Sequence, residues 1–91
     1  MRFFELKDVG VAVEDDADGV RVTSVAPDSP LAGRGLRVGG VVFRVNEVAT
    51  NSVEPFRREL RRSLVWEAGV FWVTRDGHRL TRVVHFPDGL K

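Results

Sequence analysis

Few residues in this 91-residue chain have the type and spacing that covalent or metal chemistry requires. The two histidines, His78 and His85, lie in one predicted strand pair without a third ligand or an H-E-x-x-H motif, so they form a poor metal site. No serine lies in the glycine context of a nucleophile elbow, and the absence of cysteine excludes disulfides and zinc–thiolate sites. The glycines between 33 and 40 form no nucleotide-binding motif. The sequence therefore predicts a chain that is not an enzyme and has no metal or cofactor.

The densest charge is a group of arginines on the helix predicted after Ser52. The group comprises Arg57, Arg58, Arg61 and Arg62, and it is interrupted by Glu54, Glu59 and Glu67. Nucleic-acid binding requires a broad basic face and a high net charge, whereas this chain has a net charge of +1. The pattern favours a solvated helix face and no nucleic-acid partner, while a contribution of the arginines to a ligand groove stays open.

Alternating apolar residues and turn pairs predict strands before and after this helix. Residues 9–25 are predicted to form a hairpin that turns at Asp18-Gly19, and Asp76-Gly77 is the strongest hairpin signal in the chain. The other strands are predicted at 41–45, 70–74 and 80–86, with a short extended piece at Val48.

Two helices are predicted, each after a serine that can cap its N-terminus. Ser29 precedes Pro30, which suits the first position of a short helix because the N–H there has no intrahelical partner. Ser52 precedes a longer helix with one apolar stripe. The stripe consists of Phe56, Leu60 and Leu64, which recur every four residues.

The length of the chain indicates a single domain, residues 1–91, with a modest core. Its apolar runs are far shorter than the roughly 20 residues that span a bilayer, so we expect a soluble domain without membrane insertion. The start MRFFELKD lacks the apolar stretch of a signal peptide. We expect either a cytoplasmic protein or, as the favoured alternative, a module of a larger parent protein. Trp66 is then expected to contact a neighbouring domain, and Trp72 is expected to lie in the core.

The segment VAPDSPLAGRGLRVGGVVFRVNE, from Val25 to Glu47, resembles the centre of bacterial PDZ domains. Their usual pattern there is roughly V-x-P-x-S-P-A-x-x-A-G-L-x-x-G-D-x-I-x-x-V-N-G. Over about residues 8 to 86, the order of elements is similar to the circularly permuted PDZ form of bacterial proteases. The resemblance implies an α+β fold, a small and partly open β-barrel or sandwich of about five to six strands capped by two helices. Gly40 in place of Asp, and Glu47 in place of Gly, depart from the pattern at turns.

The resemblance also implies a site where a peptide C-terminus adds as a strand to a sheet edge. Backbone N–H groups of the loop Val9, Gly10 and Val11 would hold the terminal carboxylate, with help from Lys7. The following strand and one face of the long helix would line the groove. These groove residues are Ala12, Val13, Val53, Arg57, Leu60 and Arg61.

The identities of these residues predict the ligand. Val9, Val11 and Leu60 would form a pocket for an apolar last residue. Val53 stands where one familiar PDZ class has histidine, which argues against a required Ser or Thr two residues upstream, and the helix arginines favour an acidic residue upstream. Affinity near micromolar, about −8 kcal/mol, is expected. Because the loop valines are small, a shallow groove or one that binds internal peptides stays open.

The family context implies a substrate-recognition or regulatory domain of a larger bacterial protease at the cell envelope. The parent would be an HtrA-type serine protease, a tail-specific processing protease or a site-2 metalloprotease. The alternative is a scaffold domain of a membrane or secretion complex, whose groove is empty or filled by its own chain. Binding of free C-terminal peptides by the isolated domain would distinguish the two.

Overall fold

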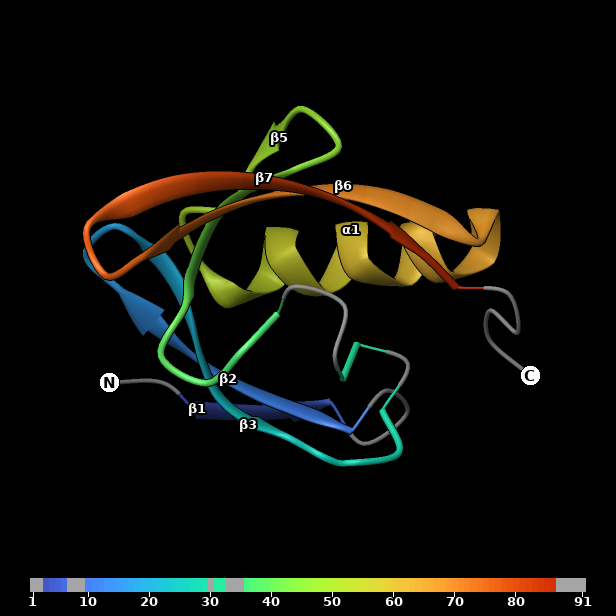
Figure 1. Cartoon of the computed structure of the whole chain (residues 1–91), viewed down its shortest axis with the longest axis horizontal. Helices are drawn as coiled ribbons and strands as arrows, with labels where there is room; N and C mark the ends of the chain where they lie inside the picture. The colour runs from blue at the N-terminus through green and yellow to red at the C-terminus, as the bar shows by residue number, and fades with distance from the viewer. Residues whose placement is uncertain (1–2, 7–9, 30, 33–35, 87–91) are drawn as a thin grey trace.

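The computed structural model describes residues 3–6, 10–29, 31–32 and 36–86 of the chain, shown in Figure 1. Within these residues, seven strands and one helix follow one another. In chain order they are β1 (Phe3–Leu6), β2 (Val11–Asp16), β3 (Gly19–Val25), β4 (Val41–Val45), β5 (Val48–Ala49), α1 (Val53–Trp66), β6 (Ala68–Arg75) and β7 (His78–His85).

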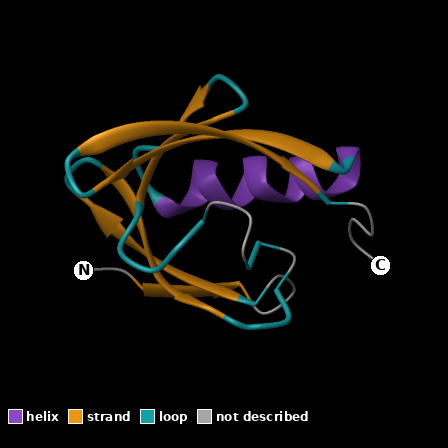
Figure 2. Cartoon of the chain, viewed as in Figure 1, coloured by secondary structure: helices purple, strands orange, loops and turns teal. Residues whose placement is uncertain are grey.

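All seven strands belong to one antiparallel sheet. Six of them lie side by side in the order β1, β2, β3, β4, β6 and β7, and β5 pairs with β4. The sheet curls, so that β2 and β3 lie on one side of the molecule and β6 and β7 on the other, with α1 between them (Figures 1 and 2). The predicted small, partly open fold is confirmed, and the described sheet does not close into a barrel because β1 and β7 are its two ends.

Short turns join the neighbouring strands of the two predicted hairpins. Asp76 and Gly77 have φ of +53° and +78°, the left-handed pair that a two-residue type I′ hairpin requires. They join β6 to β7, as predicted. The hairpin of β2 and β3 is also confirmed, with its turn at Ala17-Asp18, one residue before the predicted position.

The long helix begins at Val53 as predicted, but its capping differs from the expectation. Ser52 occupies the N-cap position, yet its side chain makes no capping hydrogen bond. The Val53 N–H instead donates to Oδ1 of Asp15 at 3.0 Å. An acidic residue of β2 therefore satisfies a free N–H at the positive end of the helix. The helix ends where Glu67 takes the left-handed conformation, at φ +64°.

The short helix predicted after Ser29 is not found among the described residues, so the prediction of two helices is wrong for them. Residues 27–29, 31 and 32 form turns, while residues 30 and 33–35 lie outside the described residues. The Ser29 hydroxyl still accepts a hydrogen bond from the Leu31 N–H at 3.1 Å, as a helix cap would. The capping interaction was thus predicted correctly, although the described residues 31 and 32 form a turn.

The strand β1 was not predicted from the sequence. It pairs antiparallel with β2, from Phe3 opposite Glu14 to Leu6 opposite Val11. This pairing adds a strand before the predicted hairpin and, together with the two-residue β5, raises the strand number above the predicted five to six.

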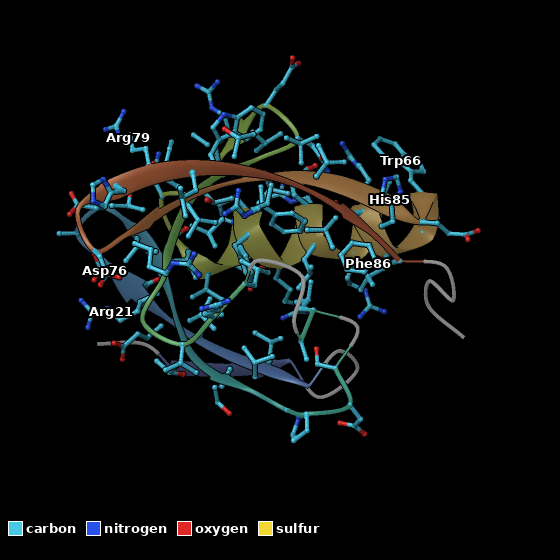
Figure 3. The ribbon with its side chains drawn as sticks, viewed as in Figure 1. Arg21, Trp66, Asp76, Arg79, His85 and Phe86 are labelled. Carbon is cyan, nitrogen blue, oxygen red and sulfur yellow. The ribbon has the colours of Figure 1, made fainter. Side chains whose placement is uncertain are left out.

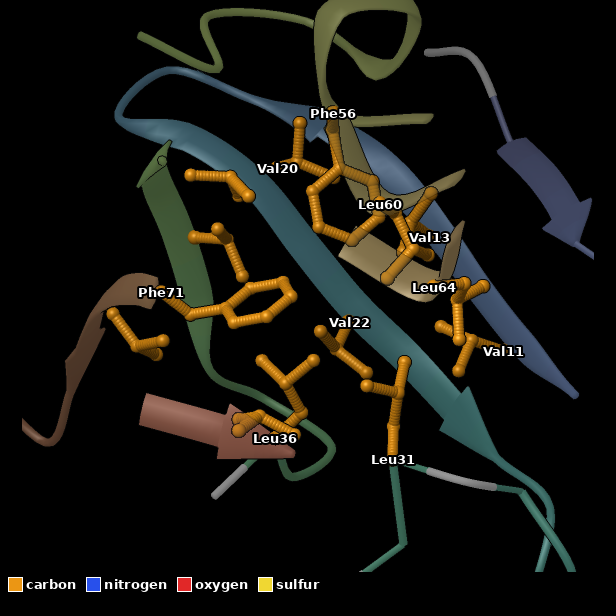
Figure 4. Close-up of a cluster of buried hydrophobic side chains, with 14 of the residues drawn as sticks. Val11, Val13, Val20, Val22, Leu31, Leu36, Phe56, Leu60, Leu64 and Phe71 are labelled. Carbon is orange, nitrogen blue, oxygen red and sulfur yellow. The ribbon is translucent and has the colours of Figure 1, made fainter. Parts of the chain in front are cut away.

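The core lies between the curled sheet and the inner face of α1, as Figure 4 shows. The rings of Phe71 and Phe86 meet edge to face, with their centroids 6.4 Å apart. The predicted apolar stripe of α1 is buried: Phe56, Leu60 and Leu64. Trp72 is only half-buried, contrary to prediction, because burial alternates along β6 and its neighbours Phe71 and Val73 face the core. The Arg44 guanidinium lies 5.7 Å from the centroid of the Trp72 ring.

Candidate peptide-binding edge

Gly10, directly before β2, has the conformation that only glycine adopts without strain, with φ +66°. Its carbonyl accepts a hydrogen bond from the Ala26 N–H at 2.7 Å. A Cβ on Gly10 would lie 3.0 Å from the Cβ of Ala26 and 3.4 Å from the Cβ of Ser29. A larger residue would therefore meet both backbone strain and crowding. The turn that follows Val25 supports the position of Gly10.

The first half of β2 is apolar and buried at Val11, Ala12 and Val13. One side of this strand pairs with β3, and the other side pairs with β1. We call the backbone of residues 11–14 on the side away from β3 the β2 edge. It is the sheet edge at which the sequence predicts that a peptide adds. In this structure it carries β1, which lies alongside β2 (Figure 1).

The helix α1 places apolar side chains beside the start of β2. Figure 4 shows Leu60 and Leu64 of α1 close to Val11 and Val13 of β2. In Figure 4 Leu60 lies beside Val13, and Leu64 lies between Leu60 and Val11, so the two described residues predicted to line the pocket of the last ligand residue are in the same cluster without being shown in direct contact. Val11 and Leu60 are each only 1% exposed, so neither offers open surface in this conformation.

At the other end of β2, the predicted groove residue Val53 is buried, and its N–H is held by Asp15. This hydrogen bond fixes the end of β2 against the first turn of α1. The N-terminal end of the helix is thereby positioned by the same strand that carries the candidate binding edge.

The predicted groove arginines, Arg57 and Arg61, lie on the exposed surface of α1. Arg57 Nη1 is 3.7 Å from Oε1 of Glu54, and about half of the Arg57 side chain is exposed. An ion pair this exposed contributes little to stability, so Arg57 can exchange Glu54 for another carboxylate at small cost. The two arginines face the solvent, as the favoured interpretation of a solvated helix face predicts.

Two predicted residues of the carboxylate loop, Lys7 and Val9, lie outside the described residues. The roles assigned to the other residues, Gly10 to Val13 on the strand side and Val53 to Arg61 on the helix side, stay predictions. Among the described residues, no three His, Asp or Glu side chains gather as a group that could hold a metal ion. Likewise, no described helix is long and apolar enough to cross a membrane.

A surface cavity of about 290 Å³ lies elsewhere, between the turn residues Asp18 and Gly77. Phe43, Thr74 and Arg79 complete its lining, and the Arg79 guanidinium lies 5.1 Å from the centroid of the Phe43 ring. Figure 3 shows Arg79 near this hairpin turn, at Asp76. None of the predicted peptide-binding residues lines this cavity.

Trp66, at the end of α1, is 64% exposed, and the Arg62 guanidinium lies 5.6 Å from the centroid of its ring. Figure 3 shows it projecting from the molecule. Its predicted contact with a neighbouring domain stays a prediction.

Two features of this region were missed from the sequence. The pairing of β1 was missed although its segment, FFEL, is rich in strand-forming residues and lies a few residues before another strand. The capping role of Asp15 was missed because its partner, Val53, is 38 residues away. The strand β1 had a local sequence signal, whereas the capping role of Asp15 had none.

A family model of the PDZ domain matches residues 7–85 of the chain. The chain therefore belongs to the PDZ domain family, and the family predicted from the Val25–Glu47 segment is confirmed. PDZ domains are non-catalytic modules that bind peptides by strand addition. A search of curated proteins finds no match.

Several solved structures are similar to this chain in fold. The PDZ domain of HtrA3, solved with the phage-derived ligand FGRWV, is 20% identical with a TM-score of 0.65, and the match covers 92% of this chain and 84% of that domain. The HtrA-type protease AlgW, solved with a decapeptide, is 19% identical with a TM-score of 0.66 over 92% of this chain, which spans only 28% of that protease. The PDZ domain of EpsC from Vibrio cholerae is 16% identical with a TM-score of 0.58, and the match covers 93% of this chain and 76% of that one.

Proposed function

We propose that this domain binds peptide C-termini by adding them as an antiparallel strand to the β2 edge, beside α1. One observation carries the proposal: the β2 edge pairs with an extended four-residue segment, β1, in the structure. The edge is therefore able to accept a strand. Gly10, at the end of that edge, has the left-handed backbone that turns successive N–H groups toward an anion in such loops.

The chemistry around the β2 edge supports an apolar last residue in the ligand. Val11, at the end of the carboxylate loop, lies beside Leu64 of the helix in an apolar cluster that also holds Leu60. Burying one apolar side chain against this cluster would contribute roughly 1.5–3 kcal/mol. The exposed arginines of α1 support an acidic residue further upstream. Strand pairing fixes the direction of the peptide, and these two features select its sequence.

The test uses the peptide FGRWV, the ligand in the HtrA3 structure, with a free and with an amidated C-terminus. Each form is titrated into the isotope-labelled full chain while backbone amide signals are followed. We expect the free acid to shift the amides of residues 10–14 and of α1, and to bind at least about tenfold more tightly than the amide, because hydrogen bonds to a charged group contribute about 1.5–3 kcal/mol. A panel of peptides with Val, Leu, Phe, Ala or Asp as last residue then measures selectivity.

Two glycine variants form a matched pair for this experiment. Gly10 and Gly77 both have left-handed φ, at +66° and +78°. A Cβ on Gly77 has no atom within 4 Å, whereas one on Gly10 meets the Ala26–Ser29 turn. We expect Gly10→Ala to abolish binding of the free acid and Gly77→Ala to preserve it, at a similar strain cost. A full panel that leaves residues 10–14 and α1 unshifted would overturn the proposal.

The context in which the domain works is a second part of the proposal. We propose a substrate-recognition or regulatory role beside a bacterial protease domain, which is supported by the likeness to HtrA-type proteases. The serine endoprotease from Yersinia pestis, for example, is 21% identical with a TM-score of 0.60 over 84% of this chain, which spans 29% of that protease. The likeness to EpsC supports the alternative of a scaffold in a secretion complex. A protease domain in the same reading frame would support the first, and a membrane-anchored secretion protein would support the alternative.

A further inference from the structure

We propose that β1 is an intramolecular ligand of the β2 edge, which a peptide must displace before it binds. This inference rests on the proposed function, and it adds a regulatory strand to it. The starting point is the position of β1, which is the end strand of the described sheet and pairs with β2 alone.

The direction of β1 is that of the proposed ligand. A peptide whose C-terminus reaches Gly10 must run antiparallel to β2 and end beside Val11. β1 runs in this way, since Phe3 lies opposite Glu14 and Leu6 lies opposite Val11. β1 therefore occupies the same stretch of edge with the same polarity as the proposed peptide.

Occupation of the edge by β1 and by a peptide is mutually exclusive. A strand presents one row of N–H and C=O groups on each side, and the row on the other side of β2 pairs with β3. A second strand cannot pair with residues 11–14 while β1 is bound there. The fraction of molecules with β1 displaced then scales the apparent affinity for peptide.

The pairing of β1 is of the kind that opens readily. It comprises four residues at the end of the sheet, with one neighbouring strand. Short edge strands and isolated two-stranded pairs are only marginally stable, and local opening of such elements costs far less than global unfolding. The short connection to β2 raises the effective concentration of β1 to about the millimolar range. β1 is therefore bound most of the time and still replaceable.

β1 differs from a C-terminal peptide at one point: the chain continues beyond Leu6, so no carboxylate ends at Gly10. An internal peptide segment offers the edge only what β1 already offers, which is backbone pairing and side chains. A free C-terminus adds the interaction of its carboxylate with the loop. Competition with β1 lowers the apparent affinity of both kinds of ligand by the same factor. Internal segments then fall below useful affinity first, because they lack the contribution of the carboxylate.

The absence of cysteine in the chain makes a reversible test possible. Phe3 and Glu14 are register partners, and directly opposed residues in an antiparallel pair have Cα atoms about 4.5–5.5 Å apart, within the range for a disulfide. The double variant Phe3→Cys/Glu14→Cys is oxidised to hold β1 in place and reduced to release it. The single variant Glu14→Cys, taken through the same oxidation and reduction, is the matched control.

We expect the oxidised double variant to bind FGRWV at least about tenfold more weakly than the reduced form, and the control to bind equally in both states. A second variant replaces residues 1–6 by Gly and Ser, keeping the length of the chain. This variant should bind FGRWV about tenfold more tightly than the natural chain. The expected factor corresponds to a rise in the fraction of molecules with a free β2 edge from about 10% to nearly all. Equal affinity of the oxidised and reduced forms, or weaker binding by the Gly/Ser variant while it stays folded, would overturn the inference.

A further measurement separates failure of this inference from failure of the proposed function. A synthetic peptide of residues 1–6, amidated at its C-terminus, is added to the Gly/Ser variant, and the amides of residues 11–14 are observed. Shifts there that FGRWV does not reproduce would support β1 as the occupant of the edge while contradicting the proposed C-terminal ligand. Shifts with FGRWV but none with residues 1–6 at millimolar concentration would support the peptide site and contradict β1 as its occupant.

Discussion

The strands β2 and β7 lie near the two ends of the sheet, and their outer sides have opposite composition. β2 begins with three buried apolar residues and pairs outward with β1. β7 pairs only with β6 among the described strands. Its exposed residues include four basic or imidazole side chains: His78, Arg79, Arg82 and His85. Charged side chains on an edge strand discourage pairing with another chain. By its composition β7 is a guarded edge, and the proposed peptide function uses the β2 edge.

The largest expected difference between the two strands is in the free energy of unfolding. Val13 in β2 is fully buried, whereas Val83 in β7 is 63% exposed. Val13→Ala should lower the stability by roughly 2–3 kcal/mol, since about two buried methyl groups and the cavity left behind both contribute. Val83→Ala should change it by less than about 0.5 kcal/mol. Urea unfolding measures both, and losses of equal size would contradict the comparison.

The next effect concerns the link of β2 to the helix. Asp15→Ala removes the acceptor of the Val53 N–H, and the loss of a helix cap costs about 1 kcal/mol. Asp18→Ala is the control, because Asp18 is an exposed residue of the adjoining turn; it should change the stability by less than about 0.5 kcal/mol. If thermal unfolding shows the two variants to be equally stable, Asp15 does not cap α1 in solution.

A smaller effect is expected at a turn that belongs to neither edge. Glu47 lies between β4 and β5 with φ +71°, a conformation that costs a non-glycine residue roughly 1 kcal/mol. Glu47→Gly should raise the stability by about 0.5 kcal/mol after the entropic cost of glycine is subtracted. Val48→Gly, in the adjoining strand, should lower it by about 0.5–1 kcal/mol. Peptide affinity should be unchanged in Glu47→Gly, and a changed affinity would extend the binding region beyond the β2 edge.

The smallest expected effect is electrostatic. Arg57→Ala on α1 should weaken binding of a peptide with an upstream Glu by about two- to fivefold, the range of exposed charge pairs. Arg82→Ala on β7 removes the same charge from the guarded edge and should leave the affinity unchanged. Titrations at low and high salt measure both, because screening should remove the effect of Arg57. A similar loss in both variants would indicate an effect of net charge and no specific contact.

Much of this fold could be predicted because its signals are local. The Asp76-Gly77 pair specified the type I′ turn of the last hairpin, and the four-residue spacing of Phe56, Leu60 and Leu64 specified the buried face of α1. Ser29 was recognised as a cap, yet its hydrogen bond to Leu31 supports a turn. A cap shows where backbone N–H groups become available, and it does not specify how many helical turns follow.

What escaped prediction depends on distant contacts or on weak patterns. The segment FFEL has adjacent apolar residues without strict alternation, so its strand character depends on pairing with β2. The bond between Asp15 and Val53 joins residues that only the folded sheet brings together. The candidate site was predicted from family resemblance, and the sequence gives no sign that its edge is already occupied.

The contacts that fix α1 to the sheet differ in kind along the helix, and they determine where the proposed site can adjust to a ligand. Near its C-terminal end, Ser63 accepts a hydrogen bond from Nδ2 of Asn46 at 2.7 Å. A Cβ on Gly69 would lie only 2.3 Å from Oγ of Ser63, so α1 packs closely against β6 at this point. At the N-terminal end, Asp15 ties the helix to β2. Toward Gly10, Val11 lies beside Leu64, and apolar contacts of this kind impose no fixed direction. Under the proposed function, adjustment to ligands of different size should therefore come from movement of the start of β2 against a stationary helix. Tolerance should then be greatest for the last residue of a peptide and should diminish upstream.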